Sequence, residues 1–144
     1  MATTASGSWR AAASKVMMRS GRHFAQFTVV EGYRMFFGVI RPGWDVEGGE
    51  NAPWEDGHCF YATYNGVSYP SGMRWGGEQD ARERADRIGM LLDLDQGSMT
   101  VWKNDVKLGV MVAEGLSGPL CWAVTLCRQV GESARIGSAV APIE

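Results

Sequence analysis

Residues 86–126 constrain the fold of this 144-residue chain more than any other stretch, because short apolar runs alternate there with turn-forming residues. Asp95-Gln96-Gly97, Asn104-Asp105 and Gly118-Pro119 separate the runs. Asn, Asp and Gly tolerate the positive φ of tight hairpin turns. The pattern therefore predicts an antiparallel β-meander. Its apolar runs are Ile88–Leu94, Met99–Trp102, Leu108–Val112 and Leu120–Leu126.

The rest of the chain predicts the same fold class. Arg34–Ile40 and Leu120–Leu126 are apolar on both faces of the pleat, which indicates central strands that are covered on both sides. A two-sheet sandwich supplies that cover and an open sheet does not. Gln79–Arg87 has no apolar stripe, so it forms one helical turn at most. We therefore expect an all-β fold, a β-sandwich of two antiparallel sheets with little or no helix. Earlier strands are expected at 15–19, 22–30, 34–41, 58–64 and 67–69.

The alternation of side chains along the expected strands identifies the residues of the core. Residues on the apolar parity of the central strands should be buried between the two sheets. The predicted core residues are Met35, Phe37, Val39, Ile88, Met90, Leu92, Val101, Val124 and Leu126.

Length and composition predict one globular domain at residues 14–144. Residues 1–13 are small and polar apart from Trp9, and we expect them to form a flexible arm. A net charge of −2 provides no basic face for nucleic acid and no polybasic tract for a membrane surface. No run approaches the ~20 apolar residues of a membrane span, and the first residues lack the apolar core of a signal peptide.

Three cysteines, Cys59, Cys121 and Cys127, lie in apolar stretches. An odd number of cysteines in a chain of this size does not suit a disulfide framework. Cys121 and Cys127 would lie ~20 Å apart along one strand, so they cannot pair. We expect reduced thiols and a cytoplasmic or otherwise intracellular protein.

No arrangement of residues predicts catalysis or metal binding. His58 and Cys59 are adjacent, and neighbours along a strand point to opposite faces, so they cannot form a dyad. Asp93–Gly97 resembles the start of a calcium loop but lacks the glutamate at its twelfth position, where Asn104 stands. We predict no catalytic residues, no metal site and no cofactor.

Several motifs occur in the order and spacing of one known family. Ser20–Phe27 reads SGRHFAQF, Phe37–Arg41 reads FGVIR, and Tyr64–Gly72 reads YNGVSYPSG. They precede the D-x-I-G, L-D-x-D-x-G, L-G and G-P-L-x-x-A-V elements of residues 86–126. Together these segments resemble the SPRY domain, the β-sandwich module also found in B30.2 proteins, over residues 14–137.

The resemblance implies a protein-interaction module that presents a shallow site, built from loops at one edge of the sandwich. Such domains bind peptides or folded partners, often as the substrate-recruiting part of a ubiquitin ligase or as a scaffold. The chain departs from the family pattern at Gln26, where glutamate is common, and at Asn104-Asp105, which replaces an Asn-Gly turn.

Two long irregular stretches, Arg41–Gly57 and Ser71–Arg87, contain tryptophans among glycines and charged residues. Long loops in a compact domain are often functional, and Trp, Tyr and Arg commonly anchor interfaces. In this family the turns after the central strands lie on one rim, so we expect the loop after Arg41 and the loop after Leu126 to meet there. The alternative is that the tryptophans fold back as lids. The candidate partner-binding residues are Arg41, Trp44, Tyr61, Arg74, Trp75, Arg128 and Gln129.

The function that we predict is non-catalytic binding of a protein or short peptide. Neither nucleic acid nor a membrane is an expected partner, and the domain is expected to be monomeric, either alone or within a larger protein or complex. The alternative is a carbohydrate-binding, lectin-like β-sandwich that stacks sugars on exposed tryptophans. A regulatory domain inside a larger channel or enzyme is a third possibility.

Overall fold

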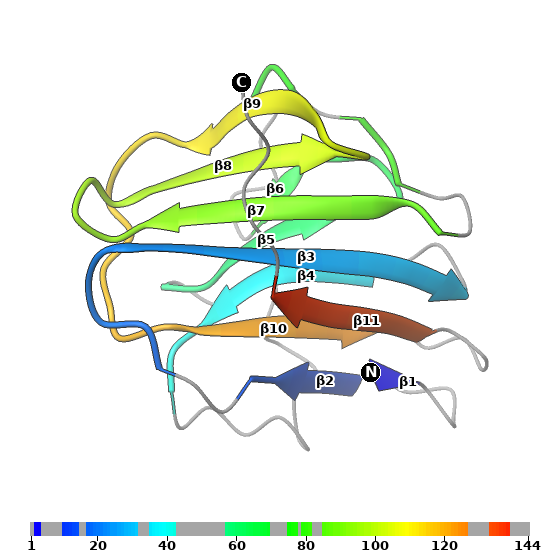
Figure 1. The fold of residues 1–144 in the computed structure, drawn as a ribbon, viewed down its shortest axis with the longest axis horizontal. Helices are drawn as coiled ribbons and strands as arrows, with labels where there is room; N and C mark the ends of the chain where they lie inside the picture. The colour runs from blue at the N-terminus through cyan, green and yellow to red at the C-terminus, as the bar shows by residue number, and fades with distance from the viewer. Residues whose placement is uncertain are drawn as a thin grey trace.

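The computed structural model describes residues 2–3, 10–14, 17–31, 35–42, 57–69, 75–77, 79–81, 85–126 and 133–138. These residues contain no helix, and so none that is long and apolar enough to span a membrane. Figure 1 shows the strands, which are β1 (Ala2–Thr3), β2 (Arg10–Ala13), β3 (Arg22–Glu31), β4 (Met35–Ile40), β5 (Cys59–Ala62), β6 (Ser68–Tyr69), β7 (Arg87–Asp93), β8 (Ser98–Lys103), β9 (Val106–Val112), β10 (Cys121–Leu126) and β11 (Ser133–Ser138).

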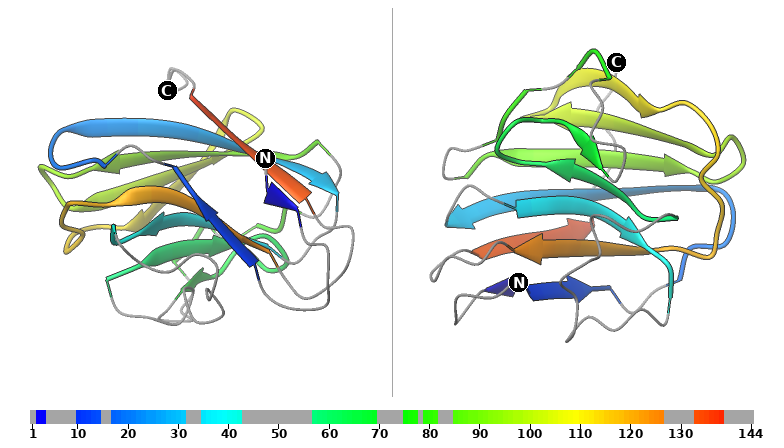
Figure 2. Two further views of the ribbon diagram at one scale, coloured as in Figure 1. Left: turned by 90° about the horizontal axis from the view of Figure 1, so that it is seen from below. Right: turned by 180° about the vertical axis from the view of Figure 1, so that it is seen from behind.

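Two antiparallel sheets face each other, as the edge-on view in Figure 2 shows. The six-stranded sheet has the order β1-β11-β3-β7-β8-β9, and the five-stranded sheet has the order β2-β10-β4-β5-β6. Strands β7, β8 and β9 form a meander of consecutive hairpins, as predicted, but the fourth run of the predicted meander, β10, lies in the five-stranded sheet. The prediction of a β-sandwich is therefore confirmed.

The main core lies between the sheets. Phe27 of β3 stacks on Phe37 of β4, with ring centroids 5.0 Å apart, and Trp122 of β10 packs edge-on against Phe27. All nine predicted core residues are fully buried, which confirms the parity that the sequence indicated.

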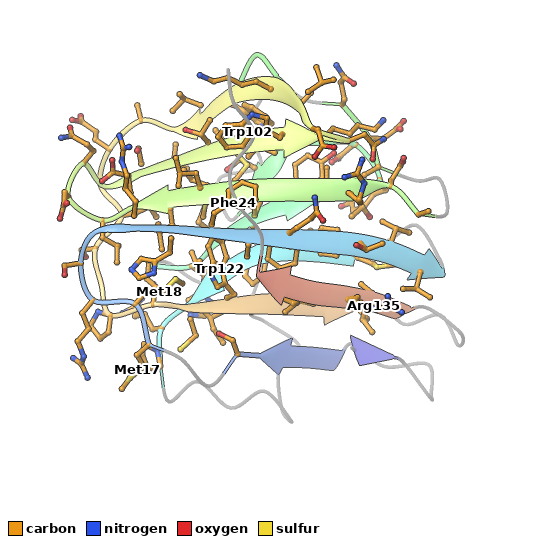
Figure 3. All side chains as sticks on the ribbon, in the orientation of Figure 1. Met17, Met18, Phe24, Trp102, Trp122 and Arg135 are labelled. Carbon is orange, nitrogen blue, oxygen red and sulfur yellow. The ribbon has the colours of Figure 1, made fainter. Side chains whose placement is uncertain are left out.

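A second apolar cluster lies on the opposite face of the five-stranded sheet. It consists of Phe36, Ile40, Phe60, Ala62, Cys121 and Ala123. Every residue of β4 and β10 is buried, so both strands are covered on both faces, as predicted. On the outer face of the other sheet, Phe24 and Trp102 pack edge to face with ring centroids 5.6 Å apart (Figure 3).

The structure differs from the sequence-based prediction near the start of the chain. Residues 10–13 form β2, which pairs with β10, instead of belonging to a loose arm. Main-chain pairing with β10 forms this strand, whose sequence RAAA has no alternation of apolar and polar side chains, and alternation is the signal that the prediction used. The strand expected at 15–19 is reduced to a bridge between Met18 and Leu120, and residues 15–16 lie outside the described part of the chain.

The predicted hairpin turns have the expected backbone. Asn104 and Asp105 adopt φ of 50° and 69°. The Asn104 side chain donates to Asp86 Oδ1 at 3.0 Å and accepts from the Arg87 N–H at 2.9 Å. The turn is therefore fixed to β7 by its own side chain as well as by its backbone.

Candidate functional site

The seven candidate partner-binding residues divide into two groups. Arg41, Tyr61 and Trp75 belong to the described part of the chain. Trp44, Arg74, Arg128 and Gln129 lie outside the described residues, so their predicted roles stay predictions.

Tyr61 does not offer an exposed aromatic ring. It lies in β5 opposite Phe37, is fully buried in the core between the sheets, and donates a hydrogen bond from its hydroxyl to the Gln79 carbonyl. Burial, together with the charges of Asp80 and Asp86, raises the pKa of this hydroxyl above its ordinary value. The prediction of a surface anchor does not fit this position, because Tyr61 shares the inward parity of Cys59.

Trp75 is half-buried, and it packs against the main core. Its indole Nε1–H donates to the Gly66 carbonyl at 2.6 Å. A Cβ on Gly66 would lie 2.5 Å from the backbone nitrogen of Gln79, so these two segments are in direct contact. We call Tyr61, Gly66, Trp75 and Gln79 the Trp75 clasp.

The Trp75 clasp joins the two sheets at one side of the sandwich. Gly66 belongs to the hairpin between β5 and β6, in the five-stranded sheet. Two residues after Trp75, a Cβ on Gly77 would lie 2.5 Å from the carbonyl oxygen of Leu108 in β9, the edge strand of the other sheet. Further along, Ala81 N–H donates to the Thr63 carbonyl at 2.7 Å. These contacts fit the alternative in which Trp75 folds back on the sandwich as a lid instead of contacting a partner.

Arg41 lies elsewhere. It follows the end of β4 directly, it is exposed, and its guanidinium lies against Gly57, where a Cβ would be 2.4 Å from Nε. Gly57 precedes the start of β5 by two residues. Arg41 therefore marks the rim at which β4 ends and β5 begins.

The loops after Arg41 and after Leu126 do not leave the five-stranded sheet at one rim. Strands β4 and β10 are antiparallel neighbours, with Ile40 opposite Cys121 and Met35 opposite Leu126. The chain therefore leaves β10 beside the start of β4, at the end of the sheet opposite to Arg41. The prediction that both loops lie on one rim is therefore wrong. The sequence does not show that β4 and β10 are adjacent and antiparallel.

Comparison with solved structures identifies the architecture. The SPRY domain of human HERC1 matches with a TM-score of 0.70 and 21% sequence identity over 94% of this chain and 86% of that one. A human SPRY domain matches with a TM-score of 0.73 and 17% identity over 92% of this chain and 86% of that one. The chain has the SPRY fold. No protein-family model and no curated protein matches the sequence.

In this SPRY sandwich the described histidines take part in packing and turn contacts. His23 Nε2–H donates to the Ser20 carbonyl at 2.8 Å. His58 is buried edge-on to Phe60 in the outer cluster, whereas Cys59 belongs to the core between the sheets. They point to opposite faces, as predicted, and burial raises the pKa of the Cys59 thiol to about 12. Cys59 therefore carries almost no thiolate at neutral pH.

The carboxylate of Asp93 forms hydrogen bonds within and beside the turn between β7 and β8 of the SPRY fold. Its carboxylate accepts the N–H groups of Asp95 at 3.0 Å and Gln96 at 3.1 Å, and Arg22 Nε at 3.2 Å. Desolvation alone would raise the pKa of Asp93, but these hydrogen bonds outweigh it and lower the pKa. The segment serves as a hairpin turn, and no group of three or more His, Cys, Asp or Glu side chains in the described residues could hold a metal ion.

The described tryptophans do not offer a flat, open ring for stacking. Trp102 and Trp122 are 3% and 8% exposed, and Trp75 is held in the clasp. Trp9, Trp44 and Trp54 lie outside the described residues. Arg41 is thus the one candidate partner-binding residue in the described part of the chain that is exposed.

Proposed function

We propose that this chain is a non-catalytic protein-interaction module, which binds a protein or short-peptide partner through loops at the rim marked by Arg41. The supporting observation is the contrast between Arg41 and the strand that precedes it. All six residues of β4 are buried, and β4 pairs with β10 on one side and β5 on the other. An exposed arginine at the end of such a strand is presented from a rigid backbone, which limits the entropy lost on binding.

The chemistry of Arg41 suits a peptide. A guanidinium pairs with a carboxylate through two parallel hydrogen bonds and can also donate to main-chain carbonyls. Trp44 follows three residues later on the same loop and remains a proposed aromatic anchor. Arg74 remains a proposed contact, and the Trp75 clasp accounts for Tyr61 and Trp75. Arg128 and Gln129 remain proposed contacts outside the Arg41 rim, because the chain leaves β10 at the opposite end of the sheet.

The finer role that we propose follows from the resemblance to SPRY domains. Within a larger protein or complex, the module would recruit a substrate for a ubiquitin ligase or act as a scaffold inside the cell. The binding step itself requires no chemistry from the domain.

A selection from a displayed peptide library tests this proposal. Peptides enriched on the immobilised domain are resynthesised, and their affinities are measured for wild type, Arg41→Ala and Arg135→Ala. Arg135 is an exposed arginine on β11 of the other sheet and serves as the matched control. We expect Arg41→Ala to weaken binding about tenfold, as for the loss of a charged hydrogen bond, with Arg135→Ala unchanged and all three melting alike.

Two results would contradict the proposal. If no peptide is enriched, the short-peptide form of the proposal is wrong. If Arg41→Ala and Arg135→Ala bind as wild type does, the contact surface lies away from the Arg41 rim.

A further inference from the structure

The turn between β5 and β6 contains the dipeptide Asn65-Gly66, and the fold requires its glycine. Gly66 has a φ of +75°, a backbone that side chains rarely adopt. A Cβ there would lie 2.5 Å from the nitrogen and 2.6 Å from the oxygen of Gln79. Asn65 precedes it at an exposed position, and its side-chain oxygen accepts the Val67 N–H at 3.0 Å. Conformation and packing therefore both impose glycine after this asparagine.

An asparagine followed by glycine is open to a specific reaction, because no side chain shields the next backbone nitrogen. That nitrogen loses its proton to water and attacks the asparagine Cγ. A C–N bond forms, the bond from Cγ to Nδ2 breaks, and ammonia leaves, which gives a five-membered succinimide. Water then opens the ring to aspartate or isoaspartate. The net reaction consumes one water and releases one ammonia, with no oxidant or reductant.

In the folded turn, hydrogen bonds hold Gly66 N and the Asn65 side chain away from the geometry that succinimide formation requires. The attacking atom, Gly66 N, donates its proton to the Ala62 carbonyl at 2.7 Å. The Gly66 carbonyl, which belongs to the next peptide group, accepts the Trp75 indole N–H at 2.6 Å, so the glycine is held on both sides. The Asn65 side chain is turned towards Val67 by its own hydrogen bond. For Gly66 N to reach Cγ, the bond to Ala62 must break and the Asn65–Gly66 peptide group must rotate, which the bond from Trp75 to the next carbonyl resists.

We propose that Asn65 is a site of spontaneous deamidation and that the Trp75 clasp controls its rate. With the clasp closed, reaction is confined to the small population in which this turn is locally open. Isoaspartate adds one carbon to the main chain between residues 65 and 66. Gly66 can then no longer meet Ala62, Trp75 and Gln79 together, so the clasp stays open after isoaspartate has formed.

The test is timed ageing of the purified full-length chain at neutral pH and constant temperature. Peptide mapping by mass spectrometry follows Asn65, and an isoaspartyl methyltransferase labels the isoaspartate product. Asn104, which precedes Asp105 and is held by two side-chain hydrogen bonds, is the internal control. A synthetic peptide of residues 62–69 supplies the unprotected rate. We expect Asn65 to react at least about tenfold more slowly in the folded chain than in the peptide.

Trp75→Phe removes the indole donor and keeps an aromatic ring, and it should accelerate reaction at Asn65 about fivefold to tenfold, as for the loss of one hydrogen bond. Asn104 should not change. The aged isoaspartate form should melt below Asn65→Asp, whose main chain is normal. A wild type that reacts at the peptide rate, or a folded Trp75→Phe variant that ages as wild type does, would overturn the proposal.

If Trp75→Phe does not fold, the wild type in urea answers the same question. Local opening of the clasp predicts that deamidation accelerates at urea concentrations well below the unfolding midpoint. A rate that stays constant until the whole domain unfolds would mean that the clasp has no separate control, and the proposal would be wrong.

Discussion

Strands β10 and β9 have similarly apolar sequences, CWAVTL and VKLGVMV, but very different surroundings. Every residue of β10 is buried, whereas Val106 and Val110 of β9 are 66% and 47% exposed. Strand β10 lies between β2 and β4, whereas β9 is an edge strand that, among the described strands, pairs only with β8. The difference shows that position within the sheet, more than the hydrophobicity of the strand, decides what each residue contacts.

The edge strand also has irregularities that β10 lacks. Its register against β8 shifts twice, between Met99 and Thr100 and between Val101 and Trp102. Bulges of this kind twist an edge away from pairing with another chain. Strand β10 pairs regularly with β4 over six residues. Substitutions in the central part of the five-stranded sheet should therefore have large effects, and matched substitutions at exposed positions of the six-stranded sheet should have small ones.

Gly38→Ala should show the largest effect. Gly38 lies opposite Ala123 of β10, and a Cβ there would be 1.8 Å from the carbonyl oxygen of Cys59, a backbone atom that no rotamer change can move. We expect a loss of about 3 kcal/mol or more in the free energy of unfolding, measured by urea denaturation. Gly137→Ala on β11 is the control, because no atom lies within 4 Å of its Cβ position. Equal stability of the two variants would contradict the role of the central strands.

Most strands of the two sheets could be predicted from local sequence, by alternation of side chains in β7 and β8 and by continuous apolar runs in β4 and β10, whereas β1, β2 and β11 were not predicted. The turns at Gly97 and Asn104-Asp105 and the inward parity of β7 and β8 are examples, since they require only neighbouring residues. The burial of Tyr61 could also have been deduced, because it shares the parity of Cys59 across β5.

The candidate site was harder to predict, because it depends on which strands are neighbours. Whether Arg41 and Leu126 share a rim is decided by the antiparallel pairing of β4 with β10, and nothing in either strand encodes that partner. The contact between Trp75 and Gly66 joins a side chain to a carbonyl, and a carbonyl has no sequence signature. For the same reason β2, which is held by backbone hydrogen bonds, was expected to be a loose arm.

Val124→Ala and Val110→Ala test the comparison with one chemical change. Val124 of β10 is fully buried, and its removal from the core costs the burial of two methyl groups and leaves a cavity, together about 2 kcal/mol. Val110 of β9 is about half exposed, and the same truncation should change stability by less than about 0.5 kcal/mol. Thermal and urea unfolding measure both. Similar losses would mean that β9 is buried by a contact outside the described residues.

Thr125→Val should produce a smaller change of opposite sign. The Thr125 hydroxyl is buried in β10 and has no hydrogen-bond partner among the described residues. Its replacement by a methyl group of similar shape should stabilise the domain by about 1 kcal/mol. The control is Thr63→Val, because Thr63 Oγ1 accepts the Met35 N–H at 2.9 Å and its loss should destabilise. If Thr125→Val also destabilises, the hydroxyl has a partner that the structure does not record.

The smallest expected effect, no change at all, concerns the thiols. Cys59 faces the core between the sheets and Cys121 faces the outer cluster, so the two cannot pair with each other, and both are free. The melting temperature should therefore be the same with and without dithiothreitol.

Burial raises the pKa of both thiols, so iodoacetamide should label them only as fast as the domain unfolds. Val110→Cys, on the exposed edge strand, should be labelled at once. Peptide mapping reads each cysteine separately, including Cys127, which lies outside the described residues. Rapid labelling of Cys121 would show that the centre of the sheet opens as readily as its edge.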